Sequence, residues 1–565
     1  MKYPVVFATA AMSLSLLRPC DADQETFVSD VHRQAIDTYL TGLSNFGYSF
    51  SVLVSQEGHI ILEKSYGAKV SSRTVFNVAS ISKQFTATAI LKLASDGRLK
   101  LSDKVSQYFP DAPTAFDNVT IDELLAHTSG IGDDYALYSA DPPLPRDEYL
   151  RRVLHRELIG QPGIKWRYSN DGYALLAKIV DLASGRPFKN YMHDALFRPA
   201  GLHATGFIGE DLWQRSLRDV PSGGNTAPLP WKDRWAGGYG ASDILSTLAD
   251  LFRWQQALNA GKILPPAWRK QLTEKVIDVL PPTLAYARGW WRRNTTLKGA
   301  PLLNIFHSGH EDDGSNGWFS YYPDQQLLLI FLSGQSIENY PLREAVFSAG
   351  PRPGVLESLA FGDSVALPPP IIPSGALRGF VGRYDIGENQ WLDVEDARPF
   401  LRITPHGQNA FNTLLPDGIP REVANGLAAI TERTRSILAG LTSDDRSGFI
   451  KAIGVRDDGT QLNPPIIDSF EVLGTAPVTK LTEAYDNVVT YVLTRRRTDT
   501  QIQHWYWNGE QLSAVYSDRS PIIPLFRQTA GTTFANLNPF RHDSTFIQFT
   551  AEGLIVGNTV MKKHR

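Results

Sequence analysis

The sequence predicts two domains, an α/β (α+β) domain followed by an all-β, barrel-like domain. Three observations predict this order. Alternating apolar residues indicate strands within residues 50–66 and again near 307–332, with a long helix-rich stretch between them. The stretch Pro368–Pro373 is mostly proline, which sustains neither a helix nor an inner strand. Beyond it, short strand-like runs alternate with turn residues.

Residues 1–22 predict a secretory signal peptide, so we expect the protein to be exported to the periplasm or secreted. A basic start is followed by an apolar run over Val5–Leu17, and small residues precede a cleavage site after Ala22. The run is too short for a membrane span, which takes about 20 apolar residues, and no later segment approaches that length. Lipidation of Cys20 is not favoured, because Arg18-Pro19 stands where a small residue is expected.

Composition agrees with a large globular protein and limits its partners. The chain of 565 residues is 42% hydrophobic, which is enough for several cores. A formal net charge of -3 argues against a nucleic-acid partner. Cys20 is the only cysteine, so the exported chain is expected to lack disulfides. The oligomeric state is left open by the sequence.

The first domain is predicted over residues 23–365. Two strands are expected within Phe50–Tyr66, on either side of a turn at Gln56-Glu57-Gly58. A buried helix is expected from Ser80 onward, because an apolar stretch follows that residue. An irregular, helix-rich region then continues to about residue 230.

The chain returns to strands near His307 and Phe319. The segment Leu327–Leu332 is apolar on both faces, as an inner strand should be. A helix at Glu344–Phe347 is expected to complete the domain, and the proline-rich stretch 366–374 is predicted to be a linker.

The second domain is predicted over residues 375–565. A helical insertion is expected at about Arg421–Leu441, and the remaining pattern is compatible with one β-barrel or with two. The runs that predict strands are Gly379–Tyr384, Trp391–Val394, Val488–Leu493, His504–Trp507 and Thr545–Phe549.

A serine and a lysine three residues apart stand at the start of the predicted buried helix. Ser80-Ile81-Ser82-Lys83 is the only place in the chain where lysine follows serine at this spacing. Residues three apart share one face of a helix, so the Lys83 amine is expected beside the Ser80 hydroxyl. A serine becomes a good nucleophile when a neighbour takes its proton, and a lysine in an apolar wall loses its charge more readily. The pair predicts a nucleophile and its base.

Two further motifs follow in order, Tyr168-Ser169-Asn170 and His307-Ser308-Gly309. The set S-x-x-K, Y-x-N and H-x-G resembles the motifs of serine hydrolases of the class C β-lactamase and D,D-peptidase superfamily, which are penicillin-binding protein-like. The resemblance spans about residues 35–350 and includes the stretch Val119–Ile131. It implies a β-lactamase-like fold, with an antiparallel sheet flanked by helices. The opening of the second domain resembles the lipocalin-like tail domain of some of these hydrolases.

The resemblance implies catalytic roles for four residues. Ser80 is expected to attack a carbonyl carbon, while Lys83 and Tyr168 share the abstraction of its proton and later donate to the leaving group. His307 is expected to complete the site from the opposite strand. No metal or cofactor is required for this chemistry.

Binding roles follow from the same resemblance. Asn170 is expected to orient the substrate amide and to hold Lys83, and Ser308 and Gly309 are expected to lie along the substrate. The backbone N–H groups of Ser80 and His310 are expected to form the oxyanion hole.

Several of these residues also have ordinary structural or metal-binding interpretations. A lone tyrosine such as Tyr168 is usually a core residue, and His127 is expected to be structural, bonding within its own turn. The segment 307–312 is rich in histidine and carboxylates, which suits a metal, but a strand would direct His307 and His310 to opposite faces. The absence of a G-x-S-x-G motif weakens an α/β-hydrolase assignment.

The histidine at position 307 narrows the predicted substrate. Relatives with lysine there set a fixed charge against a substrate carboxylate, whereas histidine is mostly neutral at pH 7. The sequence therefore favours relatives that resemble D-aminopeptidases, peptide amidases or esterases, and peptides with D or non-proteinogenic residues are the first choice. Trp290-Trp291 favours a partly apolar substrate. The alternatives are an esterase or weak β-lactamase of the same family, and a non-catalytic penicillin-binding-type sensor.

Overall fold

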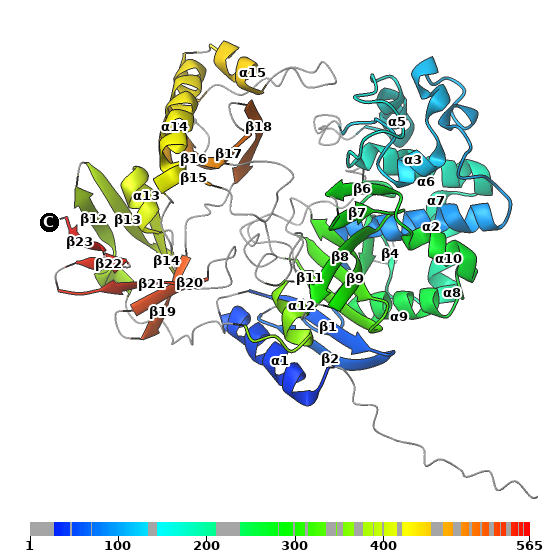
Figure 1. Ribbon diagram of the computed structural model, residues 1–565, viewed down its shortest axis with the longest axis horizontal. Coiled ribbons are helices and arrows are strands. Elements are labelled where there is room, and N and C mark those ends of the chain that lie inside the picture. The colour runs from blue at the N-terminus through cyan, green and yellow to red at the C-terminus, as the bar shows by residue number, and fades with distance from the viewer. Residues whose placement is uncertain are drawn as a thin grey trace, which may run out of the picture.

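The computed structural model describes most of residues 28–564 (Figure 1). The predicted signal peptide and the proline-rich linker lie outside the described residues. The residues not described are 1–27, 46–47, 69, 134–143, 211–237, 281, 298–299, 311–314, 335–345, 347–353, 366–376, 388, 398–399, 415–420, 444, 454–466, 478–487, 496–499, 509–510, 519–524, 531–532, 538–543, 552, 557–558 and 565.

The first domain is built on one antiparallel sheet of eight strands, in the order β2-β1-β11-β10-β9-β8-β7-β6. The N-terminal hairpin joins the last strands of the domain, since Leu53 pairs with Ile330. Every residue of β11 is buried, which confirms the predicted inner strand. The strands are β1 (Phe50–Gln56), β2 (His59–Tyr66), β6 (Ile277–Leu280), β7 (Leu284–Tyr286), β8 (Trp291–Leu297), β9 (Ala300–His310), β10 (Asn316–Tyr322) and β11 (Leu327–Ser333).

Side chains of this sheet alternate between two cores. Helices α1 (Asp30–Asn45) and α12 (Val355–Ala360) lie on one face of the sheet (Figure 1), and their apolar residues share a core with Phe306. The neighbouring residue Ile305 belongs to the other core, which the helical region builds. Of the predicted helix Glu344–Phe347 only Val346 is described, and it is helical.

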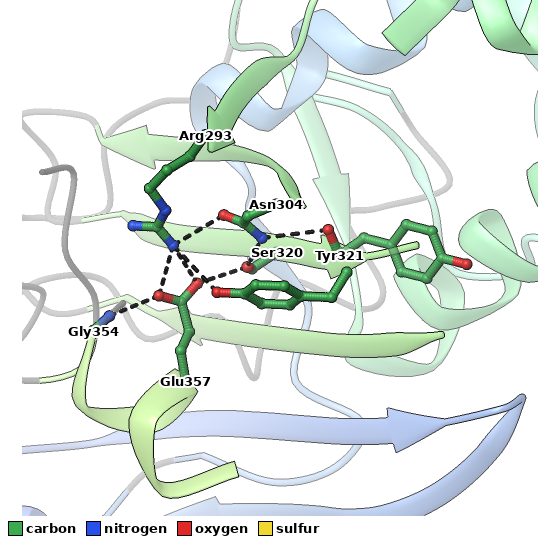
Figure 2. Close-up of polar contacts among 7 residues, drawn as sticks. Arg293, Asn304, Ser320, Tyr321, Gly354 and Glu357 are labelled. Carbon is green, nitrogen blue, oxygen red and sulfur yellow. Dashed lines mark hydrogen bonds and ion pairs between the residues drawn. The ribbon is translucent and has the colours of Figure 1, made fainter. Parts of the chain in front are cut away.

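A buried ion pair ties α12 to the sheet. Arg293 Nη2 of β8 lies 2.7 Å from Glu357 Oε2, and both side chains are fully buried (Figure 2). Asn304 accepts a hydrogen bond from Arg293 at 3.0 Å, while the Ser320 hydroxyl and the Gly354 N–H each donate to Glu357 at 2.7 Å. Loss of either partner would leave an uncompensated buried charge, so the network fixes α12 against the sheet.

The helical region covers the other face and surrounds α2 (Ser82–Ser95). Nearly every side chain of α2 is buried, which confirms the predicted buried helix, although α2 begins two residues after Ser80. The other helices are α3 (Ile121–Leu125), α5 (Arg146–Leu154), α6 (Asn170–Ser184), α7 (Phe188–Met192), α8 (Arg198–Ala200), α9 (Leu248–Asn259) and α10 (Pro266–Thr273). A small antiparallel sheet consists of β3 (Phe76–Asn77), β5 (Ile244–Ser246) and β4 (Gly206–Phe207).

The second domain contains a closed barrel in the order β12-β13-β14-β19-β20-β21-β22-β23. Strand β12 closes it, because Tyr384 pairs with Leu392 on one side and with Lys563 on the other. The predicted strand at Gly379 begins only at Gly382. The barrel strands are β12 (Gly382–Gly387), β13 (Gln390–Ala397), β14 (Phe400–His406), β19 (Leu525–Ala530), β20 (Thr533–Leu537), β21 (Ser544–Phe549), β22 (Leu554–Val556) and β23 (Thr559–Lys563).

A second module with its own core is inserted between β14 and β19. Helix α14 (Arg421–Thr442) packs on a four-stranded sheet and lies where the sequence predicts a helical insertion. The described residues thus form one barrel and one separate sheet, not two barrels. The likeness of the barrel to a lipocalin stays a prediction. The remaining elements of the insertion are α13 (Gln408–Thr413), α15 (Ser447–Ile453), β15 (Ser469–Pro477), β16 (Val488–Arg495), β17 (Thr500–Asn508) and β18 (Gln511–Asp518).

Within the described ranges, no helix combines the length and the apolar character needed to cross a bilayer.

Candidate active site

Ser80 lies in a tight turn between β3 and α2. It is the middle residue of the short helix η1 (Ala79–Ile81), so its N–H belongs to a first helical turn, where backbone N–H groups have no partner within the helix. Ala79 has a φ of 48°, a left-handed conformation that is uncommon for residues other than glycine. Asn77 Oδ1 stabilises this conformation by accepting the Ala79 N–H at 2.8 Å. The turn therefore holds Ser80 in a constrained position.

Gly309 of β9 lies directly against this turn. A Cβ atom at Gly309 would stand 2.2 Å from the carbonyl oxygen of Val78 and 3.0 Å from the Cβ of Ala79. Only a residue without a side chain permits that approach. The glycine of the H-x-G motif is therefore needed to pack β9 against η1, and its contact with a substrate stays a prediction.

Lys83 is fully buried, with 0% of its surface exposed, yet its ammonium group is well partnered. Nζ lies 3.1 Å from Ser80 Oγ, 2.7 Å from Asn170 Oδ1 and 3.1 Å from the carbonyl oxygen of Ala241. Three acceptors match the three N–H bonds of an ammonium. The centroid of the Tyr168 ring is 4.6 Å from Nζ, which adds a cation–π contact. The structure thus brings Ser80, Lys83, Tyr168 and Asn170 together.

His127 holds the loop that carries Tyr168. Its Nδ1 accepts the Ser169 N–H at 3.1 Å, and its carbonyl oxygen accepts the Arg167 N–H at 2.7 Å. The two rings of His127 and Tyr168 lie 4.3 Å apart. Burial, assisted by the charge of Lys83, lowers the pKa of His127 well below its usual range, so the ring is neutral, and Nδ1 carries no proton because it accepts the Ser169 N–H. The predicted bond within its own turn is wrong for this side chain, which bonds to the Tyr168 loop instead.

His307 is buried on the face of β9 that meets the helical region. Its Nδ1 lies 2.6 Å from the Ser308 carbonyl oxygen, and its Nε2 lies 3.1 Å from the Tyr286 hydroxyl. A carbonyl oxygen only accepts, so Nδ1 carries the proton and Nε2 accepts from Tyr286. Burial lowers the pKa of His307 to about 3, and the charge of Lys83 acts in the same direction. His307 is therefore neutral, with both ring nitrogens engaged by the protein.

The other predicted residues of this strand have separate environments. Ser308 lies on the sheet face opposite to His307, because successive residues of a strand alternate. His310 Nδ1 lies 2.8 Å from Asn316 Oδ1 of β10. Residues 311–312, which the metal interpretation requires, are not described, and among the described side chains no group of three metal-ligating residues occurs. The substrate and oxyanion roles of Ser308 and His310 stay predictions.

An aromatic cluster of Trp166, Tyr286 and Trp291 adjoins His307, and of its members only Trp291 was singled out from the sequence. The Trp291 ring lies 5.0 Å from the Tyr286 ring and 5.1 Å from the Trp166 ring. Trp290, the other member of the predicted aromatic pair, is a buried core residue. Tyr286 belongs to no motif, and its contacts with His307 and His127 identify it as part of the site.

Protonation of His307 gives a testable pH dependence. A histidine whose pKa falls from 6.5 to about 3 on folding contributes stability that is present above pH 6.5 and is lost as the pH falls toward 3. Between pH 7.5 and 5 this loss amounts to about 2 kcal/mol. The free energy of unfolding can be measured by denaturant titration at both pH values. Its decrease from pH 7.5 to pH 5 should be about 2 kcal/mol smaller in His307→Asn than in the unsubstituted protein. Equal losses in the two proteins would contradict the buried, neutral state of His307.

Comparison with known proteins assigns the family. The model of the Beta-lactamase family matches residues 43–345, more than half of the chain. Penicillin-binding protein 4* of Bacillus subtilis (strain 168) is 28% identical over 397 residues, covering 63% of this chain and 84% of the relative. The octameric penicillin-binding protein homologue from Pyrococcus abyssi aligns with a TM-score of 0.50 at 17% identity, over 84% of this chain and 96% of that chain.

D-amino acid amidase from Ochrobactrum anthropi SV3 aligns with a TM-score of 0.47 at 20% identity, over 53% of this chain and 93% of that chain. The family match spans Ser80, Lys83, Tyr168, Asn170 and His307, and the eight-stranded sheet with helices on both faces agrees with it. The chain therefore belongs to the Beta-lactamase family, and it is a serine hydrolase of the β-lactamase and penicillin-binding protein superfamily.

Proposed function

We propose that this protein is an exported peptidase or amidase that cleaves amide bonds through an acyl-enzyme on Ser80. The contact of Lys83 Nζ with Ser80 Oγ at 3.1 Å carries the proposal, because it joins a nucleophile to a proton-transfer group. Peptides that contain D or non-proteinogenic residues are the proposed substrates, and esters are the second class. The residues that carry out the chemistry are Ser80, Lys83 and Tyr168, with His307 as a neutral wall of the site.

The proton of Ser80 passes to the pair of Lys83 and Tyr168. Lys83 donates to three acceptors as an ammonium beside the Tyr168 ring, so its positive charge stabilises Tyr168 as a phenolate, and the phenolate oxygen takes the Ser80 proton. Oγ then bonds to the carbonyl carbon. The same proton passes to the leaving amine as the C–N bond breaks, which leaves an ester on Ser80. Water attacks this ester, gives its proton to the pair, and releases the acid with regeneration of Ser80.

The oxyanion of this reaction is proposed to lie between the N–H groups of Ser80 and His310. Strand β8 pairs with β9 only as far as Phe306, whereas β10 continues along β9 to His310. Residues 307–310 therefore have one backbone edge with which β8 does not pair. An extended peptide can pair with such an edge, which would place its carbonyl beside η1.

The neutral His307 supports the choice of substrate. Both of its nitrogens are engaged, so no fixed charge from this residue meets a substrate carboxylate. A charge-assisted pair contributes about 1.5–3 kcal/mol, which corresponds to about ten- to a hundredfold in selectivity. The adjoining cluster of Trp166, Tyr286 and Trp291 favours an apolar substrate group instead.

A panel of matched substrates tests this proposal. The panel contains D- and L-amino acid amides, peptides that differ only in a free or amidated C-terminus, a short-chain ester and a chromogenic β-lactam. We expect kcat/KM for amidated peptides to exceed that of their free-carboxylate counterparts by about tenfold or more. Ser80→Ala provides the background rate. Preferred cleavage of carboxylate-ended peptides would refute the substrate class, and β-lactam binding without any turnover would favour the sensor alternative.

A further inference from the structure

Asp133 lies beside Asn170, outside every motif of the site. Its two carboxylate oxygens accept separate hydrogen bonds, Oδ2 from Asn170 Nδ2 at 2.8 Å and Oδ1 from the Asp171 N–H at 3.1 Å. Burial raises the pKa of Asp133, while the bond from the Asp171 N–H and the charge of Lys83 act against the rise. Arg156 holds the segment in place, because it donates to the Gly132 carbonyl oxygen at 3.0 Å and to Asp171 at 2.9 Å.

These contacts determine how the Asn170 amide is oriented. An ammonium can only donate and a carboxylate can only accept. With Oδ1 against Lys83 and Nδ2 against Asp133, both contacts of the amide are favourable. Rotating the amide by half a turn would set NH₂ against the ammonium of Lys83 and oxygen against the carboxylate of Asp133. Asp133 therefore disfavours the flipped orientation of the Asn170 amide.

We propose that Asp133 is a positioning residue of the hydrolase, which fixes the Asn170 amide and through it holds Lys83 Nζ against Ser80 Oγ. This inference rests on the proposed role of Ser80 as nucleophile. A displacement of about 1 Å in a reacting group can lower the rate about 10²-fold, so a residue that acts only through Asn170 can still control kcat. A purely structural interpretation is also available, since Asp133 accepts an N–H in the first turn of α6 and would stabilise that helix terminus.

Exchanging the carboxylate of Asp133 and the amide of Asn170 separates the positioning role of Asp133 from a structural one. Asp133→Asn removes one of the two acceptor oxygens that Asn170 Nδ2 and the Asp171 N–H use, and we expect kcat to fall about 10²-fold with little change in KM. Asn170→Asp sets two carboxylates at hydrogen-bond distance and should lower kcat at least as much. In the double variant, the carboxylate at position 170 accepts from Lys83 and from the new amide at position 133, whose oxygen accepts the Asp171 N–H. We expect the double variant to be about tenfold or more faster than either single variant.

A matched control addresses stability. Asp250 is a buried aspartate of α9 that accepts the Ala204 N–H at 2.6 Å and the Thr205 hydroxyl at 2.9 Å. We expect Asp250→Asn to lower the midpoint of thermal unfolding and to leave kcat unchanged. If Asp133→Asn does not fold, the comparison of Asn170→Asp with the double variant carries the test. A double variant no faster than Asn170→Asp, or a folded Asp133→Asn with unchanged kcat, would overturn the inference.

Failure of the proposed function can be told apart from failure of the positioning role of Asp133. Retained turnover in Ser80→Ala would refute the proposed function itself. An inactive Ser80→Ala, together with normal kcat in Asp133→Asn, would overturn only the positioning role of Asp133.

Discussion

Replacing Ser80 by alanine is expected to lower kcat/KM by about 10⁴-fold or more, because the acyl-enzyme cannot form without its oxygen. The fold should persist, since Lys83 keeps its contacts with Asn170 and Ala241. Steady-state kinetics on the best substrate of the panel measure the rate, and thermal unfolding measures the fold. Turnover close to that of the unsubstituted protein would place the nucleophile elsewhere.

The second large effect is expected for Tyr168→Phe. The substitution removes the phenol oxygen and keeps the ring that lies over Lys83, so kcat should fall by about 10²- to 10⁴-fold, the usual loss for a general acid–base group. Tyr173→Phe is a matched control, because the Tyr173 ring also lies near Lys83, at 5.4 Å, while its hydroxyl donates to the Leu125 carbonyl oxygen. We expect that control to lose stability and to keep most of its activity.

Kinetics and thermal unfolding of the two variants show which tyrosine hydroxyl, that of Tyr168 or that of Tyr173, takes part in catalysis. Equal losses of rate in both would show that a hydroxyl near Lys83 matters only for structure. Near-normal turnover in Tyr168→Phe would assign the proton transfer to Lys83 alone.

The sequence predicts some parts of the site better than others for a physical reason. Ser80 and Lys83 lie three residues apart on one helical turn, so local geometry alone places them together. Asn170 reaches Lys83 across 87 residues of chain, and only the motif resemblance indicated that contact. Asp133 and Tyr286 carry no motif, so their roles follow from contacts that the fold creates.

The contacts of a residue were harder to predict than its place near the site. His127 bonds across to the Tyr168 loop, because that loop runs beside its turn in space and not in sequence. Trp290 and Trp291 are adjacent, yet only Trp291 joins the aromatic cluster, because Trp290 packs in the core that the helical region builds.

The second domain shows the same limit on a larger scale. Its short strands were visible as alternating runs, but the pairing of β14 with β19, through Leu401 and Phe526, skips the whole inserted module. Such non-local pairing is not encoded in local periodicity. The sequence therefore left one barrel and two barrels equally open.

The central claim is that Ser80 forms the covalent intermediate. Its most direct test is to incubate the protein with a fluorophosphonate, measure its intact mass, and locate the adduct by peptide mapping. The account predicts one adduct per chain, on the peptide that contains Ser80, and no adduct in Ser80→Ala. An adduct that persists in Ser80→Ala, or one that maps to another residue, would contradict it.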